Sequence, residues 1–264
     1  MAHTTSKDGT KIAYSKTGSG PALVIVDGAL CHRGFGPAPD LAKALAANFT
    51  VYTYDRRGRG ESGTTGAPDV DREVEDIAAL VEEAGGTANL FGMSSGGALV
   101  AEAAHRGVAA ERIAIYEAPM VVDDTHSPMA PDFVARVSRA VAEDRRGDVV
   151  KMFMRYVGTP AFAVVMMQLT PVWKKLKQVA HTLPNDLAVV GEFQHGTLPP
   201  ANRWAGAEMS ALVIAGEKSP VYMRNAQQCL ASALPNGKLV VLPGQTHMVK
   251  AAVTARVLVD FFTE

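Results

Sequence analysis

A serine flanked by glycines is the side chain of this sequence best placed to carry out chemistry. Residues 92–97 are Gly-Met-Ser-Ser-Gly-Gly, which matches the pattern G-x-S-x-G, whose central serine acts as a nucleophile. Ser94 has glycine two positions before and two positions after it, whereas Ser95 would have Met93 two positions before. Glycines at these positions let neighbouring backbone pass close to a strained turn. Ser94 is therefore the predicted nucleophile.

A serine hydroxyl is a weak nucleophile near neutral pH and needs a histidine to accept its proton. His247 is the candidate base, because it alone of the seven histidines follows the last predicted strand in a loop with Pro and Gly and precedes the last predicted helix. Two others are expected at the surface, His3 and His105. Three more lie in a helical stretch and are expected at most to touch a substrate: His126, His181 and His195.

The elements that would position these residues alternate between short apolar runs and amphipathic segments. Apolar runs of strand length occupy residues 22–26, 51–54, 89–91 and 113–116. Runs without polar alternation are typical of strands buried on both faces, as in a parallel sheet. Helical patterns lie between and after these runs, at residues 40–47, 73–84 and 98–105. This alternation predicts an α/β fold with a mostly parallel central sheet wound by helices.

The alternation stops at Met120 and resumes near residue 204. Between them lie helical patterns without a convincing strand, at residues 131–145, 148–156 and 171–180, and six of the eleven methionines. Strand patterns return at residues 212–216 and 239–242, followed by a helical pattern at 249–262. We therefore predict an α/β core formed by residues 1–119 and 204–264, interrupted by a helical cap at residues 120–203. Such an insertion acts either as a lid over a site or only as a packing module.

Taken together, these motifs resemble the α/β-hydrolase superfamily over nearly the whole chain. The Ser94 motif lies between a predicted strand and a predicted helix, as the family's nucleophile elbow does. Residues 26–29 (Val-Asp-Gly-Ala) stand where the family usually has His-Gly, after the third strand. Residues 55–62 resemble the family's D-x-R-G-x-G-x-S turn, and residues 243–247 resemble its catalytic-histidine loop. The resemblance implies the α/β-hydrolase fold and a triad in the chain order Ser, acid, His.

The acid of that triad departs from the family's commonest pattern. Most members have an aspartate after the seventh strand, in G-x-x-D, but the matching residue here is Ser219, which cannot carry the charge that stabilises an imidazolium. Some relatives carry the acid at the end of the sixth strand, where this sequence has Glu117. We therefore predict Glu117 as the acid, with Glu217 as the second candidate. In the alternative interpretation, Glu117 only pairs with an arginine such as Arg112 or with a residue of the insertion.

The resemblance also implies an oxyanion hole made of two backbone N–H groups. One belongs to the residue after the nucleophile, Ser95, and the other to the loop after the third strand, at Ala29. Because these donors are backbone groups, Asp27 in place of the usual histidine changes the local charge rather than the donors. Cys31 and His32 follow in the same loop, where they either line the pocket or are ordinary loop residues.

The reaction expected from these residues is hydrolysis of a small carboxylic ester, thioester or lactone through an acyl-enzyme on Ser94. A serine nucleophile disfavours the epoxide-hydrolase and dehalogenase branches, which use aspartate. Two alternatives stay open. The triad could serve C–C cleavage, cyanohydrin lysis or acyl transfer, or the chain could be a ligand-binding protein on a retired hydrolase scaffold. The methionine-rich insertion favours an adaptable apolar pocket, so we expect an apolar small-molecule substrate.

Composition argues against several other classes of protein. The 264 residues include 26 Lys and Arg against 27 Asp and Glu, a net charge of −1 that disfavours nucleic acid as a partner. The two cysteines, Cys31 and Cys229, cannot form a disulfide framework, and no Cys or His cluster predicts a metal site. The polar first 20 residues lack a signal-peptide pattern, and no apolar run reaches the roughly 18 residues that span a bilayer. We expect a cytoplasmic protein with no metal or organic cofactor and no membrane partner; the sequence does not indicate its oligomeric state.

Overall fold

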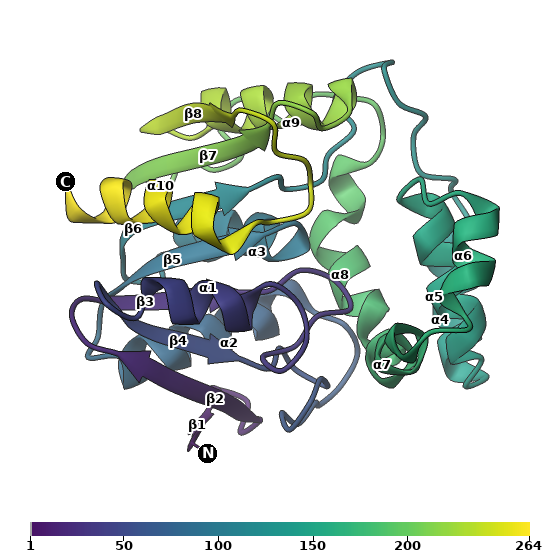
Figure 1. Ribbon diagram of the computed structural model, residues 1–264, viewed down its shortest axis with the longest axis horizontal. Coiled ribbons are helices and arrows are strands. Elements are labelled where there is room, and N and C mark those ends of the chain that lie inside the picture. Colours follow the sequence, from purple (N-terminus) through teal and green to yellow (C-terminus); the bar gives the residue numbers. More distant parts are fainter. Residues whose placement is uncertain (1) are drawn as a thin grey trace.

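The computed structural model describes residues 2–264. Within these residues eight strands form a single sheet in the order β1-β2-β4-β3-β5-β6-β7-β8 (Figure 1). The strands are β1 (Ala2–Thr5), β2 (Lys11–Gly18), β3 (Ala22–Val26), β4 (Thr50–Tyr54), β5 (Ala88–Met93), β6 (Ala110–Tyr116), β7 (Ser210–Gly216) and β8 (Gly237–Leu242). β2 is antiparallel to both β1 and β4, and every other neighbouring pair is parallel. The predicted α/β fold with a mostly parallel central sheet is confirmed.

Helices cover both faces of this sheet. On one face α1 (Ala38–Leu45) and α10 (Ala251–Thr263) pack against each other and over an apolar cluster that includes Phe49, Phe91 and Leu258 (Figure 1). The other face carries α2 (Val70–Glu83), α3 (Ser95–His105) and α9 (Val221–Ala233), whose cluster includes Ile77, Leu99 and Leu230. A sheet with both faces covered needs apolar residues at consecutive strand positions, and all six residues of β5 are buried accordingly.

Five helices lie between β6 and β7, in the stretch predicted to be an insertion. They are α4 (Phe133–Ala142), α5 (Arg146–Tyr156), α6 (Ala161–Met167), α7 (Pro171–Val179) and α8 (Leu183–Val190), with short 3-10 turns at Ala180–Thr182 and Gly191–Phe193. In Figure 1, α8 lies between the sheet and the other four. These helices share an apolar cluster of their own, which Leu30 from the loop after β3 joins. The helical content of the stretch agrees with the prediction, whereas the division into core and cap stays a prediction.

The ends of this stretch pack into the main core rather than standing apart from it. Met120 and Val122 at its beginning, and Val189, Val190 and Phe193 near its end, belong to the same apolar cluster as α2 and α3. The helices therefore connect to the core through buried side chains as well as through the chain itself.

The elements differ from the sequence-based prediction both in number and in their boundaries. Five elements were not predicted: β1, β2, α6, α8 and α9. Helix boundaries otherwise moved by a few residues; the last helix, for example, begins at Ala251 rather than at residue 249. In α7 the side chains of Lys174, Lys175 and Lys177 are exposed on one face, while Trp173 and Leu176 are buried on the other.

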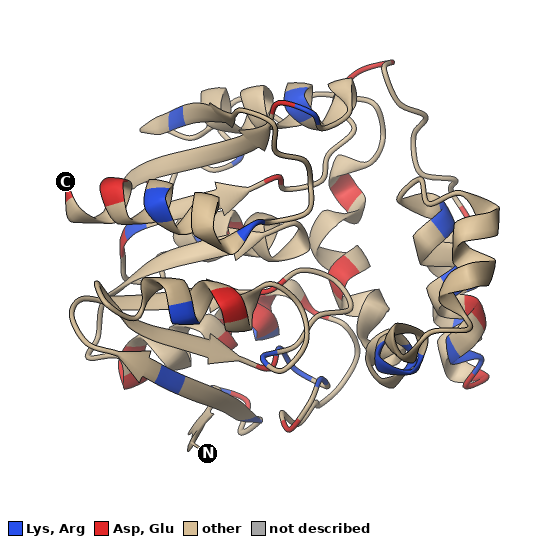
Figure 2. Cartoon of the chain, in the orientation of Figure 1, with Lys and Arg blue, Asp and Glu red and all other residues tan. Residues whose placement is uncertain are grey.

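Charges of both signs are interspersed through the fold (Figure 2). None of the helices within residues 2–264 combines the length and the apolar composition that crossing a membrane requires. Across the same residues, no group of three or more His, Cys, Asp and Glu side chains is arranged to hold a metal ion.

Candidate active site

Ser94 occupies the sharp turn that joins β5 to α3. Its backbone has φ 54° and ψ −127°, a conformation that is unfavourable in free energy for any residue other than glycine. Its side chain is half-buried. The N–H of Ser94 donates to the carbonyl of Tyr116 at the end of β6, at 2.9 Å. The turn thus lies at the carboxyl edge of the sheet and at the N-terminus of α3, where developing negative charge is stabilised. This is the geometry expected of a nucleophile elbow.

The glycines around Ser94 are required by close approach of neighbouring backbone. A Cβ on Gly92 would lie 2.3 Å from the carbonyl oxygen of Gly96, and a Cβ on Gly96 would lie 2.3 Å from the carbonyl oxygen of Val26. Both distances are far inside van der Waals contact, so only glycine lets β5 turn into α3 directly beside the end of β3. The spacing on which Ser94 was chosen therefore has a steric cause.

Glu117 and His247 are in direct contact, although 130 positions separate them in the chain. Nδ1 of His247 lies 2.9 Å from Oε2 of Glu117, and Oε1 of Glu117 accepts the N–H of Gly216 at 2.7 Å. The Glu117 side chain is fully buried, whereas that of His247 is 40% exposed. Because Nδ1 is taken by Glu117, Nε2 is the ring nitrogen left to face a reacting group. Glu117 also has a positive φ, 47°, which turns its side chain away from the strand direction.

Tyr116 connects the elbow to the histidine loop, a role that the sequence analysis missed. Its carbonyl accepts the N–H of Ser94, and its hydroxyl donates to the carbonyl of Thr246 at 2.7 Å, next to His247. Burial, reinforced by the charge of Glu117, raises the pKa of Tyr116 to about 12, so the phenol stays a hydrogen-bond donor at neutral pH. Its position directly before Glu117 is the only signal in the sequence that could have identified it.

The second candidate for the acid lies elsewhere. Glu217 is exposed, and its Oε2 accepts the N–H of Gly244 at 2.8 Å, so it helps to shape the loop that leads to His247. Ser219, at the family's usual aspartate position, is buried beside Gly216. Arg112, the partner considered for Glu117 in the alternative interpretation, bonds instead to the carbonyl of Phe261. Of the two candidates, only Glu117 contacts His247.

The two predicted oxyanion-hole donors belong to segments next to Ser94, the loop after β3 and the first residue of α3. Gly28 approaches it so closely that a Cβ there would be 3.0 Å from the Cβ and 3.6 Å from the Oγ of Ser94. Ala29 follows Gly28, and Ser95 begins α3. Among residues 2–264, no protein acceptor takes the backbone N–H of Ala29 or of Ser95. Leu30, next in the loop, has a positive φ of 59°.

Two neighbours of these donors have environments of their own. Cys31 is partly buried, and burial raises its thiol pKa to about 12, so it is not an activated nucleophile. His32 is partly exposed, and its backbone N–H donates to the carbonyl of Phe35 at 2.9 Å. Both are loop residues, and neither contacts His247.

Asp27 is a buried carboxyl directly before the oxyanion loop. It is 2% exposed, and its Oδ1 has no hydrogen-bond partner among the described residues. Burial raises the pKa of Asp27 to about 7, although the nearby charges of Arg59 and Arg56 oppose the rise. A raised carboxyl pKa means that the folded protein holds this proton more tightly than the unfolded chain, whose corresponding pKa is near 3.8.

We expect the charge of Asp27 to lower the stability of the protein as the pH rises. Between about pH 4 and pH 7 the folded state binds more protons at Asp27 than the unfolded state, so the free energy of unfolding falls with increasing pH. Asp27→Asn removes this proton equilibrium. The free energy of unfolding of the variant, relative to that of the wild type, should therefore rise by a few kcal/mol from pH 4 to pH 7. Urea denaturation at a series of pH values from 4 to 8 measures the difference, with Asp40→Asn on the exposed face of α1 as the charge-matched control. A difference that stays constant over this range would contradict a neutral buried carboxyl.

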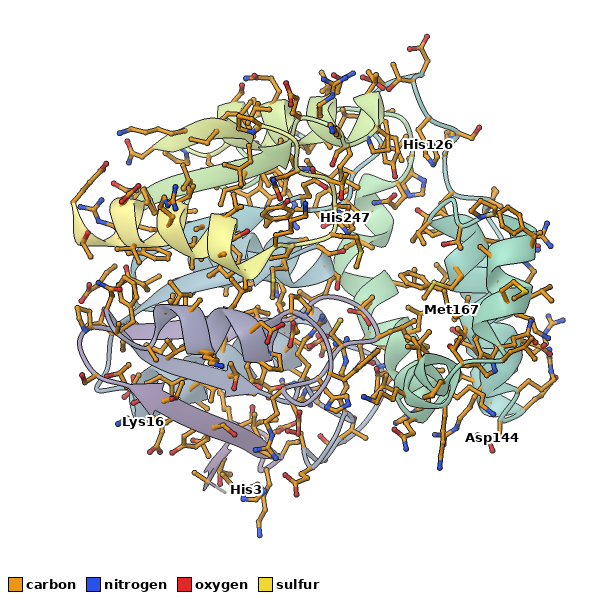
Figure 3. All side chains as sticks on the ribbon, in the orientation of Figure 1. His3, Lys16, His126, Asp144, Met167 and His247 are labelled. Atoms are coloured by element: carbon orange, nitrogen blue, oxygen red, sulfur yellow. The ribbon has the colours of Figure 1, made fainter. Side chains whose placement is uncertain are left out.

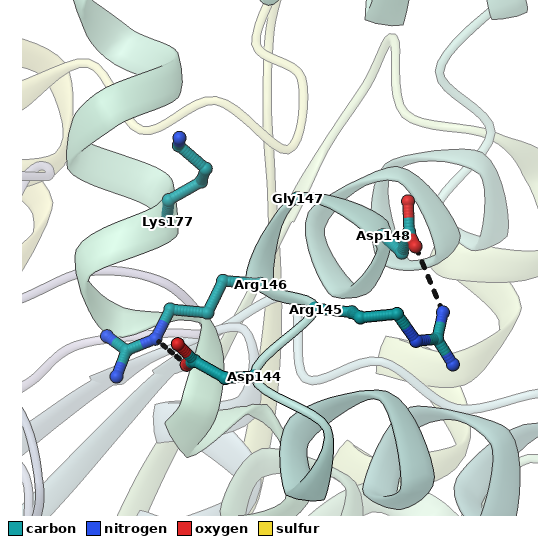
Figure 4. A pocket seen from close by; sticks show the side chains of 6 residues that line it. All are labelled: Asp144, Arg145, Arg146, Gly147, Asp148 and Lys177. Carbon is teal, nitrogen blue, oxygen red and sulfur yellow. Dashed lines mark hydrogen bonds and ion pairs between the residues drawn. The ribbon is translucent and has the colours of Figure 1, made fainter.

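Among residues 2–264, the other histidines make no hydrogen bond to Ser94, Glu117 or His247, although Tyr222, the partner of His126, is close enough to Glu117 for that charge to help burial raise its pKa. His126 stacks on Tyr222 at a centroid distance of 4.1 Å, the ring of His181 bonds the carbonyl of Gly58, and His195 is exposed. In Figure 3, His247 lies on the side of the sheet that faces the insertion, whereas Asp144 lies on the far side of the insertion. A cavity of about 390 Å³ is found there, lined by charged side chains that include Asp144, Arg146 and Lys177 (Figure 4). Its two arginines are paired with carboxylates of the same turn, so it is a charged surface recess.

Comparison with known proteins identifies the family. The sequence model of the Alpha/beta hydrolase family matches residues 27–255, which is most of the chain. The chain belongs to this family. It is also similar, with 45% identity and a TM-score of 0.91, to the crystal structure of an alpha/beta hydrolase from Sphaerobacter thermophilus DSM 20745, over 99% of this chain and 100% of that one. Comparison with curated proteins found no match.

More distant members of the fold have the same extent as this chain. An enol-lactonase from Burkholderia xenovorans LB400 aligns over 100% of both chains with 20% identity and a TM-score of 0.73. An esterase from Exiguobacterium antarcticum aligns over 100% of this chain and 99% of its own, with 18% identity and a TM-score of 0.74. At these identities the likeness establishes the fold. Membership in the alpha/beta hydrolase family itself supports hydrolase activity.

Proposed function

We propose that this family member is a serine hydrolase that cleaves a small carboxylic ester, thioester or lactone through an acyl-enzyme on Ser94. The observation that carries the proposal is the contact of 2.9 Å between Nδ1 of His247 and Oε2 of Glu117, a carboxyl that is itself held by the N–H of Gly216. A scaffold that only binds a ligand does not require this arrangement. In it, both oxygens of a buried carboxyl are hydrogen-bonded, one of them to a partly exposed histidine, and the nucleophile turn is strained. The esterase and enol-lactonase that share the fold agree with ester or lactone chemistry.

In the first half of the reaction the substrate acylates Ser94. Its Oγ forms a bond to the carbonyl carbon of the substrate, the π electron pair moves onto the carbonyl oxygen, and the hydroxyl proton passes to Nε2 of His247. The N–H groups of Ala29 and Ser95 donate to the resulting oxyanion, and Glu117 stabilises the imidazolium. Collapse of the tetrahedral intermediate breaks the bond to the leaving oxygen or sulfur, which takes the proton from His247.

In the second half water removes the acyl group. His247, neutral again, accepts a proton as the water oxygen bonds to the acyl carbon, and the same two N–H groups stabilise the second oxyanion. Breaking the bond between the acyl carbon and Oγ returns the proton to Ser94 and releases the carboxylic acid. No metal or organic cofactor is needed at either step.

The surroundings of the site favour an apolar substrate bound beneath residues 120–203, which we propose as the cap. Ala29, one of the two donors, packs against the apolar cluster of the insertion. Several flexible apolar side chains border that cluster and are only partly buried, namely Met152, Phe153, Met154 and Met167. Methionine side chains adapt to irregular shapes, so a pocket lined by these residues accommodates acyl or alcohol groups that differ in size and shape.

Labelling by a fluorophosphonate tests the proposal directly. The wild type, followed by intact-mass spectrometry, should gain one adduct per chain, because only an activated serine attacks the phosphorus centre. Ser94→Ala should gain none and should lose p-nitrophenyl ester hydrolysis, while its circular dichroism spectrum stays that of the wild type. Absence of an adduct on the folded wild type would contradict the proposal, as would an adduct that persists in Ser94→Ala.

A further inference from the structure

A buried cluster of polar side chains lies directly beneath the oxyanion loop and the elbow. Its centre is Asp186 on α8, which is 1% exposed. Oδ2 of Asp186 accepts from Nη2 of Arg59 at 2.7 Å, and Oδ1 accepts from Nη1 of Arg56 and from Oγ of Ser95, each at 2.7 Å. All four side chains are almost completely removed from solvent. An aspartate of the insertion therefore contacts the residue after the nucleophile and two of the three arginines in the β4–α2 turn, Arg56 and Arg59.

The arginines in turn bond the backbone of the oxyanion loop. Nη1 of Arg59 donates to the carbonyl of Gly28 at 2.7 Å and to the carbonyl of Cys31 at 2.9 Å. Nη1 of Arg56 donates to the carbonyl of Asp27 at 3.2 Å. Three carbonyls of one five-residue loop are thus held by two guanidinium groups, and Asp186 is the acceptor that both groups share.

One of these bonds bears directly on catalysis because of the planarity of the peptide unit. The carbonyl of Gly28 and the N–H of Ala29 belong to the same trans peptide, in which they point in opposite directions. Arg59 bonds that carbonyl and therefore sets the direction of the Ala29 N–H. A donor acts well in an oxyanion hole only when it is aimed beforehand at the position of the oxyanion. Arg59 also donates from Nε to the hydroxyl of Thr182, which fixes the plane of its guanidinium.

We propose that Arg59 and Asp186 are positioning residues of the oxyanion hole, in which Asp186 orients Arg59 and Arg59 orients the N–H of Ala29. This inference rests on the proposed function. Since α8 belongs to the stretch between β6 and β7, the insertion takes part in forming the oxyanion hole besides covering the site.

Electrostatics agree with this arrangement. Burial alone would raise the pKa of Asp186, but Arg59 and Arg56 outweigh it and hold the pKa below the ordinary value. The carboxylate therefore stays ionised at neutral pH and keeps both guanidinium groups in place. An ionised buried carboxylate with three donors is a rigid support, because moving any one donor exposes charge to an apolar interior.

The test measures kcat, KM and transition-state affinity separately in the full-length chain. Arg59→Lys keeps the charge but loses the forked geometry that reaches Gly28, Cys31 and Asp186 together. We expect kcat for a p-nitrophenyl ester to fall by about 10- to 100-fold, with KM changed less than threefold. The inhibition constant of a trifluoromethyl ketone, which forms a tetrahedral oxyanion adduct on Ser94, should rise by the same factor. A residue that only stabilised the fold would not change these two quantities together at constant KM.

Arg57→Lys is the matched control. Arg57 lies in the same turn and bonds two carboxylates, those of Asp76 and Asp8, but it contacts no carbonyl of the oxyanion loop. Its kcat and its inhibition constant should stay within about twofold of the wild type. Asp186→Asn should act in the same direction as Arg59→Lys.

The outcomes separate this inference from the proposed function. If the wild type forms the Ser94 adduct but folded Arg59→Lys keeps kcat and inhibitor affinity within twofold, the positioning role is overturned while the proposed function stands. If the wild type forms no adduct, both fall together. Should Asp186→Asn fail to fold, the folded Arg59→Lys variant decides the role by itself, because it alters the group that bonds the carbonyl of Gly28.

Discussion

Glu117→Gln is expected to lower kcat by about 10³- to 10⁴-fold, close to the loss produced by removing the acid of a serine triad. The glutamine oxygen can still accept the N–H of Gly216, but its amide then faces Nδ1 of His247 as a donor. A donor at that point forces the hydrogen of the neutral ring onto Nε2, the nitrogen that must accept the proton of Ser94. The side chains have nearly the same shape, so Tm should change little. Steady-state hydrolysis of a p-nitrophenyl ester, with thermal unfolding alongside, measures both effects.

Glu217→Gln provides the control for that substitution. It makes the same chemical change at the residue directly after β7, where the carboxylate is exposed and accepts the backbone N–H of Gly244. Its kcat should stay within about twofold of the wild type. Turnover near the wild-type value in Glu117→Gln, or a large loss in Glu217→Gln, would reverse the assignment of the acid.

Arg57→Met is expected to cost about 3–5 kcal/mol of unfolding free energy at pH 7. Nε and Nη2 of Arg57 bond the two carboxylate oxygens of Asp76 at 2.9 and 2.6 Å, and Nη1 bonds Asp8 at 2.9 Å. Asp76 is 1% exposed, so removing Arg57 leaves its carboxyl buried without its cation. Burial already raises the pKa of Asp76, against the effect of Arg57, and the pKa should rise further in the variant.

Arg145→Met shows what the same substitution costs at the surface. Arg145 also bonds two carboxylates, those of Glu143 and Asp148, but about half of its side chain is exposed. Water replaces the lost partners there, so the loss of unfolding free energy should be much smaller than for Arg57→Met. Urea denaturation of both variants gives the comparison. Equal costs at the two positions would mean that burial does not decide the strength of these ion pairs.

Much of the sheet could be predicted because its central strands are buried on both faces. Ala22–Val26 and Ser210–Gly216 are almost continuous apolar runs, and burying such a run in the interior removes its apolar surface from water. β2 escaped prediction for the opposite reason. Its three buried residues, Ile12, Ala13 and Tyr14, are preceded by exposed Lys11 and followed by four exposed positions, Ser15 to Gly18. The strand therefore shows neither alternation nor a long apolar run. α9 escaped as well, because its apolar stripe is interrupted: the amide of Gln227 is buried, whereas the apolar side chain of Val221 is exposed.

The candidate site was predictable where backbone sterics constrain the sequence and unpredictable where distant side chains meet. The glycines around Ser94 are required by contacts within a few residues and with the adjacent strand, and that requirement is visible as a motif. Glu117 could be proposed only because Ser219 stands where an aspartate is usual. Asp186 meets Arg59 across 127 positions of chain, and no local pattern records such a pairing. The hydroxyl of Tyr116, bonded across 130 positions, is hidden in the same way.

The three left-handed residues at the carboxyl edge of the sheet impose a trade-off between stability and activity. Ser94, Leu30 and Glu117 belong to the nucleophile turn, the donor loop and the acid, and they are three of the four non-glycine residues with positive φ within residues 2–264. Each such conformation costs on the order of 1–3 kcal/mol, against a total stability of roughly 5–15 kcal/mol for an ordinary domain. Favourable interactions elsewhere in the molecule must therefore offset the free energy that these three conformations cost. Relaxing these turns would strengthen the fold while moving the reactive groups apart, which limits how far this edge can be made thermostable without loss of turnover.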